Sequence, residues 1–275
     1  MADASRKLTI AELEAKAKEI RRDILEMGLR AGGCHLAPAL SSVELVTALY
    51  FRIMHLNPQD PRDEARDRFI LSAGHKCAVQ YVALAHAGYF PFEVLDTFSR
   101  LHSILGGHPG TKIPGVETPT GSLGHGLPIS VGLALGAKLQ HKPYRVFVLL
   151  GDGEVPEGSN WEAAAQASHW RLDNLVTLVD RNRLCTDGTT EEVLALEPLR
   201  ERWSSFGWAV REIDGHTMPE VVDALEAVPF VPGKPSLLVA NTVKGKGISF
   251  IENRVEWHYR IPEGEEIEHA RRDLR

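Results

Sequence analysis

The sequence predicts an α/β fold: a doubly wound, mostly parallel sheet with helices on both faces. Five short apolar runs have the continuous character of buried parallel strands, and helical stretches separate most of them. These runs cover residues 69–71, 146–150, 175–179, 209–213 and 237–240. Ligands of such sheets bind beyond the carboxyl ends of the strands, so functional residues are expected just after each run.

Two helical patterns precede the first apolar run. Between residues 8 and 29, apolar side chains recur at three- and four-residue spacing, and a pair of glycines follows. A second pattern covers about residues 41–54, where Ser41 or Ser42 is expected to cap the helix. Residues 1–60 are therefore expected to form an N-terminal helical segment.

The composition is that of a soluble domain. The 275 residues are 43% hydrophobic and 25% charged, which suits one large domain spanning 1–275. The net charge of −6 is spread along the chain, so neither composition nor charge favours a nucleic-acid partner. Residues 253–275 are polar and strongly charged, which indicates a C-terminal surface extension or an interface that orders with a partner.

The cysteines and the N-terminus indicate a cytoplasmic protein. Three widely spaced cysteines without a C-x-x-C pair fit reduced intracellular thiols. The N-terminus has no apolar signal region, and no run approaches the roughly 18 apolar residues of a membrane span. We therefore expect no secretion and no membrane partner.

A Gly-Asp-Gly motif at residues 151–153 directly follows the second apolar run. Asn182 comes twenty-nine positions after its last glycine, at the end of the next run. Glycines let the backbone approach an anionic phosphate, and a helix beginning near Glu157 or Ser159 would add its positive dipole end. Gly-Asp-Gly alone is most often a turn, but a strand, this motif, a helix, a strand and an Asn in succession favour a phosphate site.

A hard divalent cation would complete such a site. It prefers oxygen ligands in octahedral array, which Asp152, Asn182 and a nearby backbone carbonyl can supply. The sequence therefore predicts that the cation bridges phosphate oxygens to the protein.

The segment from residue 151 to 182 resembles the thiamine diphosphate fingerprint of transketolases, and the resemblance extends over nearly the whole chain. Several further motifs occur in the family's order. They are Leu-Ser-Ala-Gly-His at 71–75, Gly-Gly-His-Pro at 106–109, Thr-Gly-Ser-Leu-Gly at 120–124, Thr-Val-Lys-Gly-Lys-Gly at 242–247 and Trp-His at 257–258.

The resemblance implies a cofactor and a set of ligands. The metal, Mg²⁺ (or Ca²⁺ or Mn²⁺), would be held by Asp152, Asn182 and the carbonyl of Leu184, with thiamine diphosphate as the cofactor. The residues implied to contact the cofactor are His75, Gly121, Ser122, Leu123, Gly153, Glu157, Asn182, Lys244 and His258.

Four histidines are implied to line the channel where a ketose enters: His35, His75, His108 and His258. Neutral or cationic imidazoles can bind hydroxyls and move protons near neutral pH, which suits a catalytic role. A zinc site formed by Cys34, His35, His75 and Cys77 has suitable ligand types but lacks the usual structural-zinc spacing.

Glu157 has two interpretations. The resemblance implies an interface carboxylate that links two cofactor sites. A glutamate that caps the start of a helix is the alternative.

The resemblance covers only the diphosphate-binding half of a transketolase. It implies a partner, the C-terminal subunit, which carries the pyrimidine-binding domain and a catalytic Glu, in an α2β2 assembly. The implied reaction is transfer of a two-carbon ketol unit from a ketose, such as a sugar phosphate, to an aldose. This chain would be inactive without that partner.

Three residues depart from the family's pattern and leave the substrate open. Tyr259 stands where a glycine is common, Lys76 stands where a small residue is common, and Cys34 precedes the first channel histidine without the usual glycines. Alternatives are the α subunit of a 2-oxoacid dehydrogenase, a deoxyxylulose-phosphate synthase fragment, or a non-catalytic cofactor-binding subunit. The Gly-His-Pro motif and residues 244–247 favour transketolase over the other two enzymes.

Overall fold

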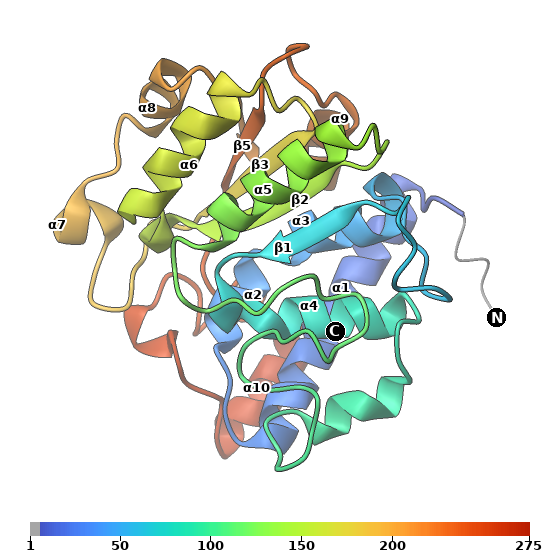
Figure 1. The fold of residues 1–275 in the computed structure, drawn as a ribbon. Helices are drawn as coiled ribbons and strands as arrows, with labels where there is room; N and C mark the ends of the chain where they lie inside the picture. The colour runs from blue at the N-terminus through green and yellow to red at the C-terminus, as the bar shows by residue number, and fades with distance from the viewer. Residues whose placement is uncertain (1–5) are drawn as a thin grey trace.

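A five-stranded parallel sheet separates two layers of helices (Figure 1). The structure, a computed structural model, describes residues 6–275. Every neighbouring pair of strands is parallel, which confirms the predicted fold class. In spatial order the strands are β1 (Arg68–Leu71), β2 (Val146–Gly151), β3 (Leu175–Arg181), β5 (Ser236–Asn241) and β4 (Ala209–Asp214).

The helices divide between the two faces of the sheet. One face packs against α5 (Gly126–Leu139), α6 (Gly158–His169) and α8 (Leu199–Ser205). The other packs against α1 (Ile10–Ala31), α2 (Leu36–Ser41), α3 (Val43–Ala48), α4 (Cys77–His86) and α9 (Met218–Glu226). The short α7 (Thr190–Leu194) lies away from the sheet, and α10 (Glu265–Asp273) lies near α1 (Figure 1).

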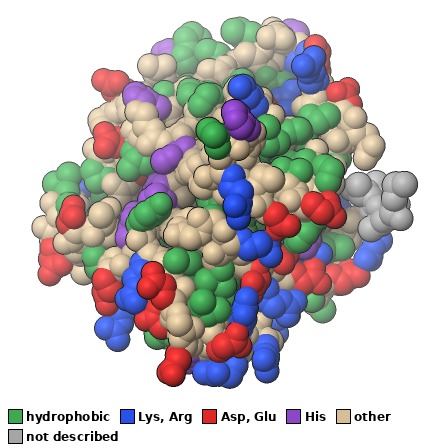
Figure 2. Space-filling model, turned by 90° about the horizontal axis from the view of Figure 1, so that it is seen from below, with side chains coloured by type: hydrophobic (Ala, Val, Ile, Leu, Met, Phe, Trp, Pro, Cys, Tyr) green, Lys and Arg blue, Asp and Glu red, His purple; other side chains and the backbone are tan. Residues whose placement is uncertain are grey.

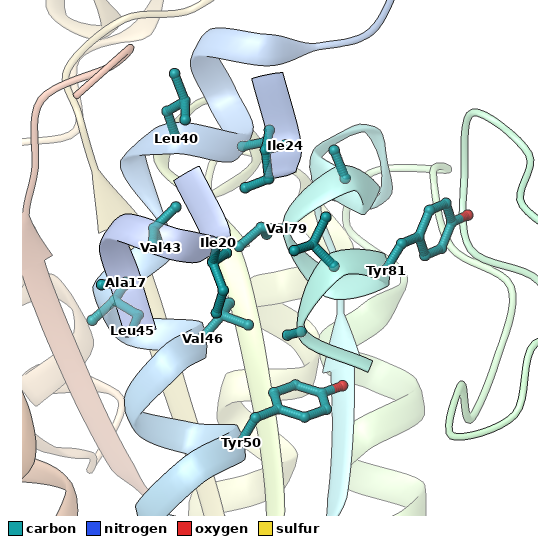
Figure 3. Packing of buried hydrophobic residues seen from close by; sticks show 14 of the residues in the cluster. Ala17, Ile20, Ile24, Leu40, Val43, Leu45, Val46, Tyr50, Val79 and Tyr81 are labelled. Carbon is teal, nitrogen blue, oxygen red and sulfur yellow. The ribbon is translucent and has the colours of Figure 1, made fainter. Parts of the chain in front are cut away.

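Alternation along each strand supplies both hydrophobic cores. Phe147 and Leu149 of β2 face the α1 layer, whereas Val148 faces the α5 layer. All three side chains are fully buried, as expected for a parallel sheet covered on both faces. Figure 3 shows the α1 layer, where Ile20 of α1 packs with Val46 of α3.

The first predicted helix has clear start and stop signals. Thr9 and Glu12 form a capping box, in which each residue bonds the backbone N–H of the other. Gly32 ends the helix in the left-handed conformation, with φ of 74°. Part of the predicted N-terminal segment, residues 1–5, lies outside the described residues.

The second helical pattern forms differently from the prediction. The expected single helix is divided into α2, α3 and a π-helical turn at Leu49–Ile53. Neither Ser41 nor Ser42 caps a helix; both hydroxyls donate to the buried carboxylate of Asp180, at 2.5 and 2.6 Å. A buried carboxylate needs donors more than a helix end that is already closed by backbone bonds.

The C-terminal segment packs against the domain. Trp257, Ala270 and Leu274 are buried, and Arg271 of α10 forms an ion pair with Glu26 of α1. Residues 253–275 are polar on their outer side, but they fold onto α1 rather than extending from it. Across residues 6–275, no helix has both the length and the apolar character needed to cross a bilayer.

Candidate active site

The loops that follow β1, β2, β3 and β5 surround a cavity of about 210 Å³. These strands are parallel, so the loops meet at the same edge of the sheet, where the sequence predicted a site. Ten of the predicted residues line it: His35, His75, Gly121, Leu123, Asp152, Gly153, Asn182, Leu184, Lys244 and His258. Ser122 and Glu157 are exposed and do not line the cavity, and His108 lines a neighbouring one.

Asp152 begins a single 3₁₀ turn directly after β2. One carboxylate oxygen accepts from the Gly153 N–H at 2.9 Å, and the other accepts from the Arg183 N–H and from Arg181 at 3.2 Å. Burial, followed by the nearby Asp180 carboxylate, raises the pKa of Asp152. A divalent cation would reverse this effect, because it favours the ionised carboxylate.

Three oxygen donors of the predicted metal site line the same cavity: the Asp152 carboxylate, the Asn182 amide and the Leu184 carbonyl. The Asn182 amide oxygen accepts from the Leu184 N–H at 3.1 Å, while its nitrogen donates to Asp180 at 3.5 Å. These contacts fix which end of the amide is the oxygen. One carboxylate, one amide and one carbonyl, together with phosphate oxygens, suit Mg²⁺ or a similar hard cation.

The zinc alternative is wrong for the described residues. Within 6–275, no group of three or more His, Cys, Asp or Glu side chains is arranged to hold a metal ion. Burial raises the pKa of both Cys34 and Cys77 to about 12, so these thiols keep their protons at neutral pH. Zinc binds the thiolate form, which this environment disfavours.

Lys244 joins the loop after β3 to His258. Its Nζ donates to the carbonyl oxygens of Cys185 at 2.9 Å and Leu184 at 3.4 Å, and it lies 2.9 Å from Nδ1 of His258. An ammonium group only donates, so Nδ1 of His258 accepts and the ring proton is assigned to Nε2. Burial and the charge of Lys76 lower the pKa of Lys244 to about 8.

The four predicted histidines lie close together. The ring centre of His35 is 5.1 Å from that of His75, 5.4 Å from that of His258 and 6.4 Å from that of His108. On the face drawn in Figure 2, histidine side chains gather in one region, while acidic and basic side chains intermingle elsewhere.

The three more enclosed histidines are neutral at pH 7. Burial lowers the pKa of His35 to about 4, of His75 to about 2 and of His258 to about 3. The sequence allowed neutral or cationic imidazoles, and the burial of these three rings selects the neutral form. A neutral imidazole can donate one hydrogen bond and accept another, which suits hydroxyl and carbonyl groups.

A second cavity of about 240 Å³ adjoins the first and shares His35 and His75 with it. His108 lines this second cavity, together with Cys34, Cys77, Phe98 and Tyr259 among others. None of the described residues around it is a lysine or an arginine. The second cavity therefore offers hydrogen-bonding and apolar surface but no fixed cation.

Gly121 allows the turn at 120–124 to approach the histidine loop. Its φ is +131°, and a Cβ atom there would lie 2.5 Å from Cδ2 of His108. A Cβ at Gly74, next to His75, would lie 2.6 Å from the carbonyl carbon of Thr120. Larger residues at either glycine would therefore separate the turn from the cavity.

Glu157 does not cap the helix that it precedes. It occupies the N-cap position of α6, but its side chain makes no capping hydrogen bond and is exposed. The capping interpretation is therefore wrong, since the exposed carboxylate is directed away from the backbone donors.

The sequence analysis missed Glu154, which is 1% exposed. Its carboxylate accepts from the hydroxyl of Ser72 and from the N–H groups of Gly124 at 2.9 Å and Gly151 at 3.2 Å. Burial raises its pKa in spite of these donors. Its place directly after Gly-Asp-Gly, beside a buried strand, was the available signal.

A buried ion pair beneath the cavity was also missed. Lys76 Nζ lies 2.5 Å from Asp180, and the two side chains are 2% and 0% exposed. Burial alone would raise the pKa of Asp180, but the Lys76 ammonium and the hydroxyls of Ser41 and Ser42 lower it to about 2. The lysine that departs from the family's pattern therefore neutralises the carboxylate two residues before Asn182.

Residues 14–275 match the family model described as the thiamine diphosphate binding domain of transketolase. One of the two subunits of the apulose-4-phosphate transketolase of Actinobacillus succinogenes is 46% identical over 98% of this chain and 98% of its own length. A 6-deoxy-6-sulfo-D-fructose transketolase subunit of a Clostridium species is 43% identical over 90% of each.

A solved transketolase from Campylobacter jejuni superimposes with a TM-score of 0.91 at 31% identity. The match covers 97% of this chain and 43% of that longer one. Fold, cavity residues and sequence similarity agree, and the chain belongs to the transketolase family, whose thiamine diphosphate-binding domain it matches over nearly its whole length.

Proposed function

We propose that this chain is the thiamine diphosphate-binding subunit of a two-chain transketolase. The enzyme would transfer a two-carbon ketol unit from a ketose to an aldose, and the cytoplasm would be its compartment. The observation that carries the proposal is the convergence of Asp152, Asn182, the Leu184 carbonyl, Lys244 and His258 on one cavity. The two relatives that match it over most of their length are both named as transketolase subunits.

The metal-binding residues would anchor the cofactor. Asp152, Asn182 and the Leu184 carbonyl would hold a Mg²⁺ ion that neutralises the diphosphate. Gly153 permits close approach of the backbone, and Lys244 adds a positive charge on the opposite wall. Thiamine diphosphate, when bound, supplies the carbanion chemistry of the reaction.

The histidines would act on the sugar. His35, His75 and His258 are neutral, so each can donate to a ketose oxygen or accept a proton from a hydroxyl. Lys244 holds His258 with its Nε2–H free to donate, because Nδ1 already accepts from the ammonium. His108 is more exposed and lines only the second cavity, which suits contact with the part of the sugar away from the reacting carbons.

A second subunit would complete the active site. It would bring the pyrimidine-binding domain and the catalytic glutamate to the turn at 120–124, where Gly121 and Leu123 line the cavity and Ser122 is exposed. Glu157 is exposed beside this turn and would link two cofactor sites in an α2β2 assembly. This contact agrees with its lack of any capping bond within the chain.

The substrate would be a sugar phosphate or a similar anionic sugar. The two relatives are named for different sugars, a phosphate and a sulfonate. Since no described residue around the second cavity is Lys or Arg, the cation that binds the sugar's anionic end would come from the partner subunit.

Calorimetric titration tests this proposal. Thiamine diphosphate and Mg²⁺ are titrated into the chain alone and into its mixture with the product of the neighbouring reading frame, followed by a ketose-to-aldose transfer assay. Tight binding and turnover only in the mixture are expected. Binding without transfer from any common ketose would favour a non-catalytic or otherwise specialised subunit, and no binding at all would refute the proposal.

A further inference from the structure

Tyr259 is a large side chain at the mouth of the second cavity. It is 66% exposed, yet its ring centre lies 4.6 Å from that of His35, in an edge-to-face arrangement. Its hydroxyl would lie 3.4 Å from a Cβ placed on Gly33. No hydrogen bond from any other described residue holds that hydroxyl, so the ring is positioned by contact with His35 and Gly33.

The chain on both sides of Tyr259 is anchored. Trp257 is 4% exposed, and Arg260 stacks on it with the guanidinium 4.1 Å from the ring centre. Ile261 is 9% exposed and packs into the α1 core. These contacts fix the backbone at residue 259, so the phenol is presented to the cavity by a rigid support.

The facing wall of the cavity is rigid as well. Cys77 is 2% exposed, and its thiol donates to the carbonyl oxygen of Gly107 at 3.2 Å. Cys34 and Phe98 are buried at 3% and 2%. The residues that line this cavity are thus mostly immobile, and Tyr259 is the large, solvent-exposed ring among them.

We propose that Tyr259 determines substrate specificity by limiting the length of sugar that the second cavity accepts. The inference rests on the proposed function, in which the reacting carbons lie in the first cavity, between His75 and His258. A sugar that extends past His35 then meets the Tyr259 ring before it reaches solvent. Removal of the ring opens the mouth of the cavity and admits longer sugars, without changing the site that holds the cofactor.

The reconstituted two-chain enzyme tests this proposal with two donors, xylulose 5-phosphate and sedoheptulose 7-phosphate. In Tyr259→Ala, the kcat/KM ratio of the seven-carbon to the five-carbon donor is expected to rise about tenfold, a usual size for a steric change in a pocket. Tyr259→Phe is the matched control, since it keeps the ring; its ratio is expected to stay within about twofold of the wild type. An unchanged ratio in the Ala variant, or a Phe variant that behaves like Ala, overturns the steric role.

A second measurement needs neither partner nor cofactor. Cys34 and Cys77 line the cavity behind Tyr259, so their alkylation by a bulky maleimide reports the width of the entrance. In the isolated chain, Tyr259→Ala is expected to accelerate this reaction at least about fivefold relative to Tyr259→Phe, with iodoacetamide as the small reagent for comparison. Equal rates for Ala and Phe would contradict the assignment of Tyr259 as the wall.

The two measurements separate the inference from the function on which it rests. If the wild-type pair neither binds the cofactor nor transfers a ketol unit, the proposed function fails, and substrate selection fails with it. The alkylation rates still decide whether Tyr259 closes the cavity. If the wild-type pair is active and the donor ratio does not respond to Tyr259→Ala, the function stands and the specificity role is refuted.

Discussion

The Nζ atom of Lys244 lies 2.9 Å from Nδ1 of His258, and this contact connects the loop after β5 with the C-terminal segment. The same ammonium donates to the carbonyl oxygen of Cys185, next to the predicted metal ligand Leu184. One side chain therefore supports the metal loop, orients a histidine and supplies a positive charge to the cavity wall. The C-terminal segment is part of the site for this reason.

Lys244→Met is expected to weaken thiamine diphosphate binding by about 10- to 100-fold, because hydrogen bonds to charged groups contribute roughly 1.5–3 kcal/mol. The methionine also leaves Nδ1 of His258 without a donor. Calorimetry on the two-chain mixture measures the affinity. Lys246→Met is the matched control on the same loop, since Lys246 is more exposed and pairs with Glu252 at 3.6 Å. Equal affinities of the two variants would refute the role of Lys244.

Asp152→Ala is expected to abolish metal-dependent cofactor binding rather than to slow turnover alone. The variant removes the one carboxylate among the three predicted metal ligands, and Arg181 keeps Glu191 and Glu197 as partners, so the fold is expected to survive. Cofactor titration with and without Mg²⁺ measures the effect. Asp187→Ala, which removes an exposed carboxylate from the same loop, is the control. Undiminished binding by Asp152→Ala would show that the metal is held elsewhere.

Local signals in the sequence were sufficient for the sheet and for the central motif. Each strand is a short apolar run, and the polar groups of Asp152 and Asn182 follow two neighbouring strands directly. A parallel sheet brings such positions together whatever the rest of the chain does. The strand ends were predicted to within two residues for the same reason.

The failures come from partners that are distant in the sequence. Ser41 and Ser42 have the local character of helix caps, but Asp180, 139 and 138 residues away, takes their hydroxyls. Ser72 donates to Glu154 across 82 residues, so the importance of that carboxylate is visible only in the fold. Propensity reports what a residue can do locally, and a buried charge elsewhere in the chain can override it.

Glu154→Ala is expected to lower the free energy of unfolding by about 2–4 kcal/mol, because it leaves buried donors at Ser72, Gly124 and Gly151 without their acceptor. Glu157→Ala, three residues away and exposed, is expected to change the stability of the isolated chain by less than about 0.5 kcal/mol. Urea unfolding of the isolated chain compares the two. A Glu154 variant as stable as Glu157→Ala would mean that the carboxylate does not hold the three loops together.

His75 gives a pH dependence with a definite sign. Burial holds its folded-state pKa at about 2, whereas the unfolded chain takes up the proton near its ordinary value of about 6.5. Below pH 6.5 the unfolded state binds more protons, so acidification destabilises the folded protein through this residue.

His75→Gln removes that contribution. Between pH 7 and pH 5, the unfolding free energy of the wild type is therefore expected to fall by about 1–2 kcal/mol more than that of the variant. Urea unfolding at both pH values measures the difference, and His169→Gln, at an exposed position of α6, controls for the loss of one histidine. A parallel fall in wild type and His75→Gln would mean that His75 is protonated in the folded chain. The neutral-imidazole role proposed for it in sugar binding would then be wrong.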